Sequence, residues 1–242
     1  MSIWFLNAVI IEGTAILGVL SVVLTKRTRG AFALGFGTML PVTAVYVLSL
    51  NPVRGRAFVI LLMVVVYLGH MTWLVLAQHR STAIPKLDAR LPLLHKLLMP
   101  VVLANTVGWI YCLPFYFAAR NDRPFGTLDV LALAVYALGT LIHFGSDYQK
   151  HRFKRQPESR GRLLTTGFWA LCRHPNYFGD FLVYVSFAIL AQHPLGWIAP
   201  VTNVLQYLFD AIPKNETWAA EKYGEAWEEY KSRTKRFVPF VY

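Results

Sequence analysis

Five long apolar runs constrain the fold of this chain more than any other feature of its sequence. They cover residues 3–24, 31–50, 57–77, 97–118 and 128–145. Each is close to the roughly 20 apolar residues that a helix needs to cross the hydrocarbon core of a bilayer. A sixth run, 181–209, is interrupted by His193 and Pro194, so it could form two spans or a hairpin that dips into the membrane. We therefore expect an all-α, polytopic membrane bundle of about six to seven transmembrane helices.

The composition agrees with a membrane protein. Of the 242 residues, 55% are hydrophobic and 15% are charged, whereas an average soluble domain is less apolar and more charged. The first run has no basic segment before it and no small-residue cleavage site after it, so we expect a retained span rather than a signal peptide. Cys112 and Cys172 lack a CxxC spacing, so we expect neither a disulfide framework nor a metal site. Without an internal repeat or a low-complexity linker, residues 1–242 are expected to form one membrane domain.

Positive charge is distributed unevenly between the connections of these runs. Of the 24 Lys and Arg residues, all except Arg54, Arg56, Arg120 and Arg123 fall on one side of the expected membrane. Cytoplasmic loops retain positive charge, so this side, which includes the C-terminus, is expected to be cytoplasmic. Topology and anionic lipid headgroups account for the net charge of +11, and we expect no nucleic acid partner.

A first polar block, 147–180, follows the fifth run. If the helix of that run continues past the membrane face, Asp147, Lys150 and Lys154 share one stripe, because they follow one another at i, i+3 and i+7. Such residues often only snorkel at the end of a transmembrane helix. The cluster of polar groups nevertheless indicates a binding surface on the cytoplasmic side.

The stretch CRHPNYFGDF places hydrogen-bonding side chains directly before the next apolar run. Pro175 suits the first position of a helix. Asn176 or Tyr177 would then lie in the first turn, where free backbone N–H groups and the helix dipole favour an anion. Arg173 supplies a planar fork that suits phosphate or carboxylate. The alternative is an interfacial belt, in which Trp169 and Tyr177 lie at headgroup level and Arg173 binds lipid.

A second polar block, 213–242, predicts an amphipathic cytoplasmic helix followed by an extended tail. One face of this helix would contain Glu216, Ala219, Tyr223, Trp227 and Tyr230. Such a face is usually plain packing. This face also carries a carboxylate and two phenols, with Lys222 beside it, and these groups could hydrogen-bond a ribose or an amide.

Three motifs carry a resemblance to a known family. DYQKHRFK, LLTTGFWALCRHPNYFGDF and NETWAAEKYGEAWEEYKSR, with a final VPFVY, resemble in order and spacing the C-terminal half of the sterol C14 and C7 reductases, the group that includes lamin B receptor. The chain is also similar to bacterial membrane proteins of the steroid 5-alpha-reductase C-terminal type, whose length it shares. The resemblance covers residues 140–242, while residues 1–130 match only in hydropathy. By RHPxYxG, the isoprenylcysteine carboxyl methyltransferases are more distantly similar.

The resemblance implies that the cytoplasmic half binds NADPH. The residues it assigns to the cofactor are Asp147, Lys150, Lys154, Trp169, Arg173, His174, Asn176, Tyr177, Asp180, Asn215, Glu216, Lys222, Tyr223 and Tyr230. The chain departs from the family pattern at Asn215, where the family has Asp, and at Ala219, where it has Cys. A contact to the cofactor is therefore expected to be missing or altered, and the shorter chain leaves the sterol itself open as substrate.

Charge favours NADPH over S-adenosylmethionine, the cofactor of the methyltransferases. NADPH carries about four negative charges, whereas S-adenosylmethionine is cationic and needs carboxylates. Basic residues outnumber acidic residues in the segment 147–180. Thr217 also stands where the methyltransferases have the second Glu of a pair. A membrane methyltransferase remains the alternative interpretation.

Ionisable groups inside the apolar runs are candidates for catalysis. They are Glu12, Tyr67, His70, Tyr111 and His143. Tyr67 and His70 are spaced i and i+3, so they share a helix face, and YLGHMT resembles the Tyr-x-x-His region of the steroid 5-alpha-reductases. By this resemblance Tyr67 is the expected proton donor and His70 its orienter, although a Tyr in a span is often only packed. Glu12 is a second candidate, because a buried carboxylate would stay protonated.

Together these patterns predict an NADPH-dependent membrane reductase of a C=C bond in a lipophilic substrate, a steroid, sterol-like molecule or other enone lipid. Hydride would pass to one carbon and a proton to its neighbour or to a conjugated oxygen. A third interpretation is a non-catalytic lipid-binding scaffold, which would keep the pocket without the acid.

Overall fold

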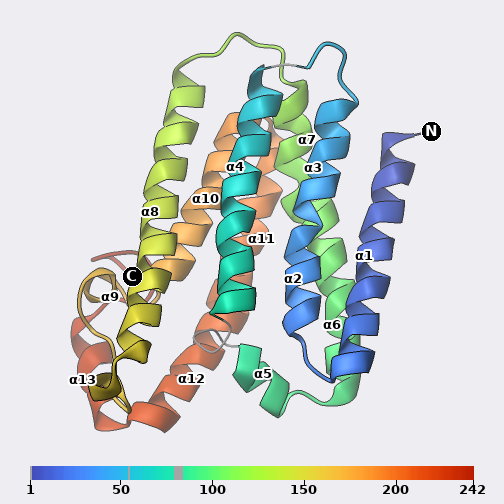
Figure 1. Cartoon of the computed structure of the whole chain (residues 1–242). Coiled ribbons are helices and arrows are strands. Elements are labelled where there is room, and N and C mark those ends of the chain that lie inside the picture. The colour runs from blue at the N-terminus through green and yellow to red at the C-terminus, as the bar shows by residue number, and fades with distance from the viewer. Residues whose placement is uncertain (1, 54, 79–83) are drawn as a thin grey trace. The chain divides into compact units, whose positions relative to one another are not determined.

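The computed structural model describes residues 2–53, 55–78 and 84–242, apart from the side chain of Leu87. Every regular element in these ranges is a helix (Figure 1), so the all-α prediction is confirmed. The chain divides into two compact units. Unit 1 contains Met1–Ala132 and Phe187–Ala199, and unit 2 contains Leu133–Ser186 and Pro200–Tyr242.

Five helical segments are long and apolar enough to cross a membrane, which confirms the five predicted runs. They are Ile3–Thr25, Arg29–Leu48, Gly55–Ala77, Leu93–Arg120 and Thr127–Arg155. The chain is therefore a multi-pass membrane protein. Several of these segments consist of helices joined end to end, because π-helical turns or a short turn interrupt the regular α-helix.

Unit 1 contains the first four spanning segments. Its helices are α1 (Ile3–Thr25), α2 (Arg29–Gly37), α3 (Met39–Leu48), α4 (Gly55–Thr72), α5 (Ile84–Arg90), α6 (Leu93–Asn105) and α7 (Leu113–Arg120), and wide turns follow α4 at Trp73–Ala77 and α6 at Thr106–Tyr111. Small residues bring α1 close to α6: a Cβ added to Gly18 would lie 2.6 Å from the Cβ of Pro100. Glycine at such a contact lets transmembrane helices pack backbone to backbone.

One buried ion pair ties the start of α4 to the start of α8 within unit 1. Arg56 Nε lies 2.5 Å from Asp129 Oδ1, and the two side chains are 3% and 1% exposed. Arg56 also donates to the carbonyls of Arg123 and Pro124, and Asp129 accepts from the Gly126 backbone N–H. A buried pair of this kind is tolerated only when further hydrogen bonds satisfy both partners.

Unit 2 contains most of α8, α10 and α11 and the whole of the other helices that follow α8, because Phe187–Ala199 belongs to unit 1. They are α8 (Thr127–Arg155), α9 (Phe168–Leu171), α10 (Pro175–Ala191), α11 (Ile198–Gln206), α12 (Ile212–Tyr223) and α13 (Glu225–Arg233). Because α8 continues to Arg155, the predicted extension of the fifth span is confirmed, and it carries Asp147, Lys150 and Lys154.

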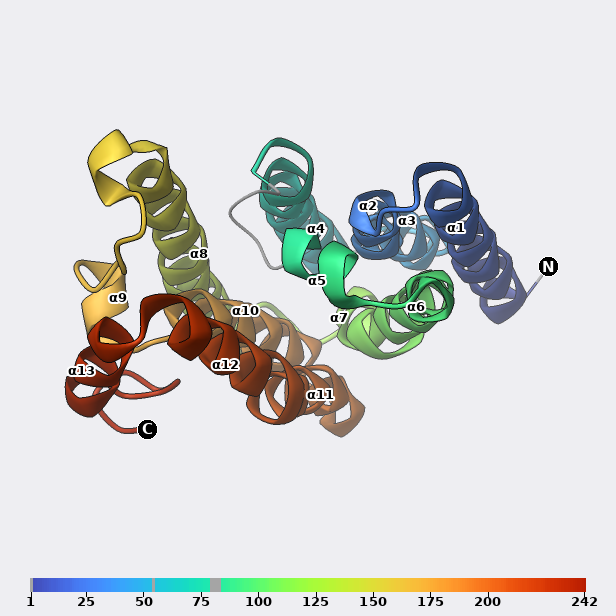
Figure 2. The same cartoon turned by 90° about the horizontal axis from the view of Figure 1, so that it is seen from below.

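The interrupted run 181–209 folds into two helices rather than one. The chain leaves α10, turns through Pro194–Trp197, and returns as α11. Figures 1 and 2 show α11 beside α10, and Asn203 of α11 donates to Asp180 of α10. With 17 residues, α10 is about 26 Å long, close to the minimum for crossing a bilayer.

The predicted single amphipathic helix in the second polar block is wrong. Gly224 separates α12 from α13 with φ 53° and ψ −124°, a conformation that favours glycine and ends the helix. The five residues assigned to one face are therefore divided between two helices. The predicted extended tail is also wrong, because the backbone N–H of Phe237 donates to the carbonyl of Tyr242 and the tail turns back on itself.

Candidate functional site

The RHPNYFGD motif folds as the entry to α10. Pro175 opens the helix, so Asn176 and Tyr177 lie in its first turn, as the sequence predicts. Immediately before it, the Arg173 backbone N–H donates to the Lys235 carbonyl at 2.7 Å. This bond ties the entry of α10 to the C-terminal tail of unit 2.

Glycines allow α8 and α10 to touch along their backbones within unit 2. A Cβ added to Gly139 of α8 would lie 2.9 Å from the Gly179 carbonyl oxygen, and a Cβ on Gly179 would collide with the His143 backbone. Real Cβ atoms do not approach backbone atoms this closely. The crossing therefore requires glycine at both positions, and it places the polar side chains of the two helices against one another.

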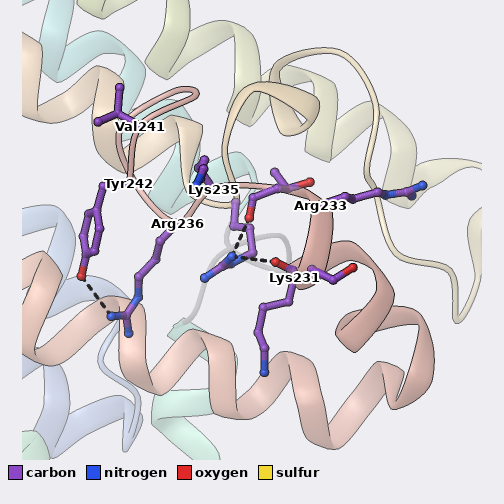
Figure 3. A pocket seen from close by; sticks show the side chains of 9 residues that line it. Lys231, Arg233, Lys235, Arg236, Val241 and Tyr242 are labelled. Atoms are coloured by element: carbon purple, nitrogen blue, oxygen red, sulfur yellow. Dashed lines mark hydrogen bonds between the residues drawn. The ribbon is translucent and has the colours of Figure 1, made fainter.

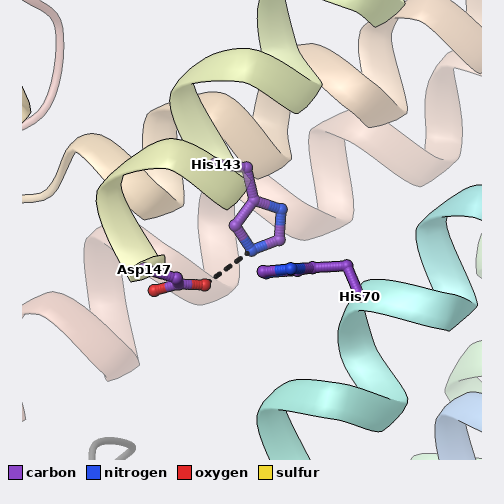
Figure 4. A group of neighbouring side chains, drawn as sticks. All are labelled: His70, His143 and Asp147. Carbon is purple, nitrogen blue, oxygen red and sulfur yellow. Dashed lines mark ion pairs between the residues drawn. The ribbon is translucent and has the colours of Figure 1, made fainter. Parts of the chain in front are cut away.

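His143 lies between two carboxylates at this crossing. Its Nε2 is 3.4 Å from Asp147 Oδ2 on the same helix (Figure 4), and its Nδ1 is 3.5 Å from Asp180 Oδ1 on α10. Asn176 Nδ2 donates to Asp147 Oδ1 at 3.2 Å. The His143 imidazole thus lies between Asp147 and Asp180, and the Asn176 amide bonds to Asp147. Both carboxylates are buried.

Two residues that the sequence analysis missed complete the surroundings of Asp180. Asn203 Nδ2 donates to Asp180 Oδ2 at 3.1 Å, and Tyr207 Oη donates to the same oxygen at 2.5 Å. The signal that would have found them is their spacing, since an Asn and a Tyr at i and i+4 put polar atoms on one face of an otherwise apolar run.

Three flat rings stand in a row beside this cluster. The rings of His174 and Tyr177 are 5.6 Å apart with an angle of 5° between their planes, and those of Tyr177 and Tyr207 are 4.3 Å apart at 11°. Asn215 Nδ2 donates to Tyr177 Oη at 2.9 Å and fixes the central ring. Near-parallel aromatic faces of this kind can stack a planar ligand ring.

Glu216 connects α12 to the entry of α10. Its Oε1 accepts from Arg173 Nε at 2.8 Å and lies 3.3 Å from His174 Nε2, while its Oε2 lies 3.4 Å from Arg236 Nε. Burial raises the pKa of Glu216, but the hydrogen bonds and charges of His174 and Arg173 outweigh it and lower the pKa to about 2. Burial lowers the pKa of His174, with Glu216 opposing that shift.

Trp169 and Tyr230 support the segment before α10. Tyr230 Oη donates to the Trp169 carbonyl at 2.5 Å, and Trp169 Nε1 donates to the Ser146 carbonyl of α8 at 3.2 Å. Lys150 Nζ lies 4.8 Å from the centre of the Trp169 ring. Burial raises the pKa of the Tyr230 phenol. The structure thus gives Tyr230 a backbone partner, so it positions the loop that bears Arg173.

The remaining predicted cofactor residues are more exposed. Lys154 and Lys222 are exposed and Tyr223 is half-buried. Lys222 Nζ lies 4.8 Å from the centre of the Tyr223 ring. These side chains are therefore more accessible to a ligand than those around Glu216.

The three predicted catalytic residues belong to unit 1. Tyr67 and His70 are buried on the same face of α4, at 1% and 9% exposure, as their spacing predicts. The Tyr67 ring meets Phe187 edge to face at 6.5 Å, and the His70 ring lies 5.5 Å from Trp73. Glu12 is exposed on α1, so the expectation that this carboxylate is buried within the protein is wrong.

Comparison with known proteins identifies relatives. The profile of the family described as "Protein of unknown function (DUF1295)" matches residues 32–234. The chain is 32% identical over 126 residues to the Delta(14)-sterol reductase of Arabidopsis thaliana, a match that covers 47% of this chain and 34% of that protein.

Two further relatives carry the same name. The Delta(14)-sterol reductase TM7SF2 of Mus musculus is 29% identical over 154 residues, covering 56% of this chain and 36% of that protein. The Delta(14)-sterol reductase of Methylotuvimicrobium alcaliphilum is 28% identical over 168 residues, covering 56% and 38%. The chain thus spans little more than a third of the length of the curated relatives it matches.

Proposed function

Because the chain belongs to the DUF1295 family and is similar over about half its length to Delta(14)-sterol reductases, we propose that it is a membrane reductase of a carbon–carbon double bond. The substrate is a lipophilic molecule of the sterol or enone-lipid class, and the reductant is NADPH. Unit 2 binds the cofactor from the cytoplasmic side of the membrane, where the basic residues of the chain gather.

One observation carries this proposal: predicted cofactor residues from three separate blocks of sequence contact one another within unit 2. Asn176 donates to Asp147, Asn215 donates to Tyr177, and Arg173 pairs with Glu216. A helix that merely ends at a lipid headgroup layer needs no such bonds between distant segments. Side chains held in place before a ligand arrives lose less entropy on binding it, which supports a binding role.

The side-chain groups of unit 2 fit a phosphorylated dinucleotide. The cations of Lys150, Lys154 and Arg173 suit phosphate oxygens. Carboxylates and amides on the same surface suit ribose hydroxyls. A cation–π contact with Trp169 positions Lys150, and an ion pair with Glu216 positions Arg173.

NADPH supplies a hydride to one carbon of the double bond. The chain must then hold the two reactants in line, exclude water and deliver a proton. In this proposal Tyr67 donates the proton from the buried face of α4 and His70 orients it. The T-shaped contact with Phe187 restricts the Tyr67 ring and keeps its surroundings apolar.

Cofactor titration of the purified chain in a neutral detergent tests the binding half of the proposal. Thermal unfolding should shift upward with NADPH, since a ligand at 100 times its Kd stabilises by about 2.7 kcal/mol. Glu216→Gln should weaken that shift, whereas Glu225→Gln, an exposed control on α13, should not. Stabilisation by S-adenosylmethionine and not by NADPH would contradict the proposal and favour a methyltransferase.

Turnover tests the catalytic half. With NADPH and a Delta(14)-unsaturated sterol, mass spectrometry should detect the hydrogenated product. Tyr67→Phe should reduce turnover roughly 10²- to 10⁴-fold, the usual contribution of a general acid, with NADPH affinity unchanged. Tyr46→Phe, which alters an equally buried phenol of unit 1, is the matched control. Equal losses in both variants would remove Tyr67 as the donor.

A further inference from the structure

A basic cavity lies in unit 2 between the loop before α10 and the C-terminal tail (Figure 3). Its volume is about 360 Å³, at the small end of the range of ligand pockets. Five of its lining residues are cationic, and none has a carboxylic acid side chain: the cations are Arg173, Lys231, Arg233, Lys235 and Arg236. Only Arg173 belongs to the predicted cofactor set, so the cofactor proposal does not account for this concentration of charge.

Arg173 is held rigidly at one wall of the cavity. Its Nε donates to Glu216 Oε1 at 2.8 Å, and its Nη1 donates to the carbonyls of Thr234 at 2.6 Å and Lys231 at 3.3 Å. A guanidinium fixed on these sides still presents Nη2, for which no partner is recorded among the described residues. A preorganised fork of this kind suits an oxyanion.

Arg236 is oriented by the same carboxylate. Its Nε lies 3.4 Å from Glu216 Oε2, and its Nη1 donates to Tyr242 Oη at 3.4 Å. Glu216 therefore anchors two guanidinium groups from one side, and its single negative charge is shared between them and His174. The positive charge on the cavity side is left without an equal counter-charge.

The other three cations of the cavity, Lys231, Arg233 and Lys235, form only weak ion pairs or none among the described residues. Lys231 pairs with Glu228 at 2.7 Å and Arg233 with Glu229 at 3.3 Å, but these carboxylates are 59% and 70% exposed. Exposed pairs of this kind are screened by solvent and contribute little. The structure records no ion pair for Lys235 among the described residues. All three side chains are therefore available to an incoming anion.

We propose that this cavity binds a phosphoryl group at a site that borders the cofactor site at Arg173 and is otherwise built from residues outside it. Its source is the headgroup of an anionic phospholipid or a soluble phosphate compound. Fixed arginine forks supply directional bonds, and the mobile lysines and Arg233 supply charge. This binding site goes beyond the proposed reductase activity and does not depend on it.

Isothermal titration of the full chain in a neutral detergent tests the site. The probes are dihexanoyl phosphatidylglycerol, dihexanoyl phosphatidylcholine and inorganic phosphate. A variant with Lys231→Gln, Arg233→Gln and Lys235→Gln removes three charges from the cavity and keeps the Arg173 contacts. The control variant, Arg155→Gln with Arg160→Gln and Arg162→Gln, removes three exposed charges of unit 2 elsewhere. The cavity variant should bind the anionic probe at least about tenfold more weakly, and the control should lose less than about twofold.

The probes separate the two sources. Binding of phosphatidylglycerol that inorganic phosphate does not displace identifies a lipid headgroup site, and competition at similar concentrations identifies a soluble phosphate site. Both results support the proposal. Equal weakening in the two variants, or binding of neither anionic probe, overturns it, because the charge would then act diffusely or not at all.

NADPH titration of the same samples distinguishes this site from the cofactor site. The cavity variant should keep its NADPH affinity within about twofold while it loses the anionic probe. Loss of both together would overturn the proposal by merging the cavity with the cofactor site. Failure of NADPH to bind any sample would contradict the proposed function. The titration with the anionic probe would then still show whether the cavity binds a phosphoryl group.

Discussion

Two buried threonines of unit 1, Thr38 and Thr43, bond within their own helical segments, whereas several polar side chains of unit 2 bond between helices. Thr43 of unit 1 donates to the Met39 carbonyl one turn earlier at 2.6 Å. In unit 2, by contrast, Asn176 reaches Asp147, and Tyr207 reaches Asp180. A bond within a helix survives any packing, but a bond between helices requires one arrangement. The bonds of Asn176 and Tyr207 therefore constrain how the helices of unit 2 pack, whereas the bonds of Thr38 and Thr43 place no such constraint on unit 1.

The largest effect is expected in unit 1, at the buried ion pair between Arg56 and Asp129. Asp129→Asn would leave a guanidinium buried without its counter-charge, which costs about 3–5 kcal/mol in the free energy of unfolding. Denaturant titration in detergent measures this loss. Asp122→Asn, at an exposed neighbouring position, is the control. An equal effect of both changes would show that the pair does not stabilise unit 1.

The second largest effect is expected on the pH dependence of the free energy of unfolding, through Glu216 of unit 2. Since the folded pKa of Glu216 is about 2 and its ordinary value is 4.5, its ionised form stabilises the fold fully above pH 4.5. That contribution, on the order of 1–3 kcal/mol because solvent screens the partly exposed carboxylate, is lost as pH falls from about 4.5 to about 2. Unfolding free energies measured across this window should fall less steeply in Glu216→Gln. Identical slopes would contradict the assigned pairing.

Two glycines, one in each unit, differ in how closely a neighbouring helix packs against them. Gly179→Ala would force a methyl group into the His143 backbone and should destabilise unit 2 by about 1–3 kcal/mol. Gly13→Ala on α1 meets nothing within 4 Å and should be neutral or stabilising. Melting temperatures of the two variants provide the test. A tolerated Gly179→Ala would mean that α8 and α10 do not need to touch.

The smallest expected effect concerns the shape of a single cation. Arg173→Lys keeps the charge but replaces two separate nitrogens, Nε and Nη1, with one ammonium, which does not reproduce the positions of the bonds to Glu216 and the two carbonyls. NADPH affinity should therefore fall about tenfold, or 1.4 kcal/mol. Arg162→Lys, on an exposed loop of unit 2, should leave the affinity unchanged. If Lys at position 173 binds NADPH as tightly as Arg, the fork geometry has no role in binding.

The sequence predicted the elements of unit 2 that depend on residue type. Pro175 announced the start of α10, and the motif residues Asp147, Asn176 and Asp180 proved to be neighbours. Their partners Asn203 and Tyr207 were missed, because a lone Asn and Tyr in an apolar run look like ordinary packing. A pairing between distant segments becomes visible only when the helices are folded against each other.

The break at Gly224 was missed for a different reason. The helical period runs through this position without a fault, so the residues on either side seem to share one face. Only the positive φ of Gly224 ends α12, and an exposed glycine is compatible with both outcomes. Glu12 shows the same limit in unit 1, since hydropathy locates a span but does not say which of its faces is covered.

Hydrogen–deuterium exchange with and without saturating NADPH tests most directly the claim that unit 2 is the cofactor-binding half. We predict that bound NADPH slows exchange in segments 143–180 and 203–236, where the polar bonds between helices lie, and changes it little in residues 2–53 and 55–78. Protection confined to the unit 1 segments, with none around Arg173 and Glu216, would contradict it.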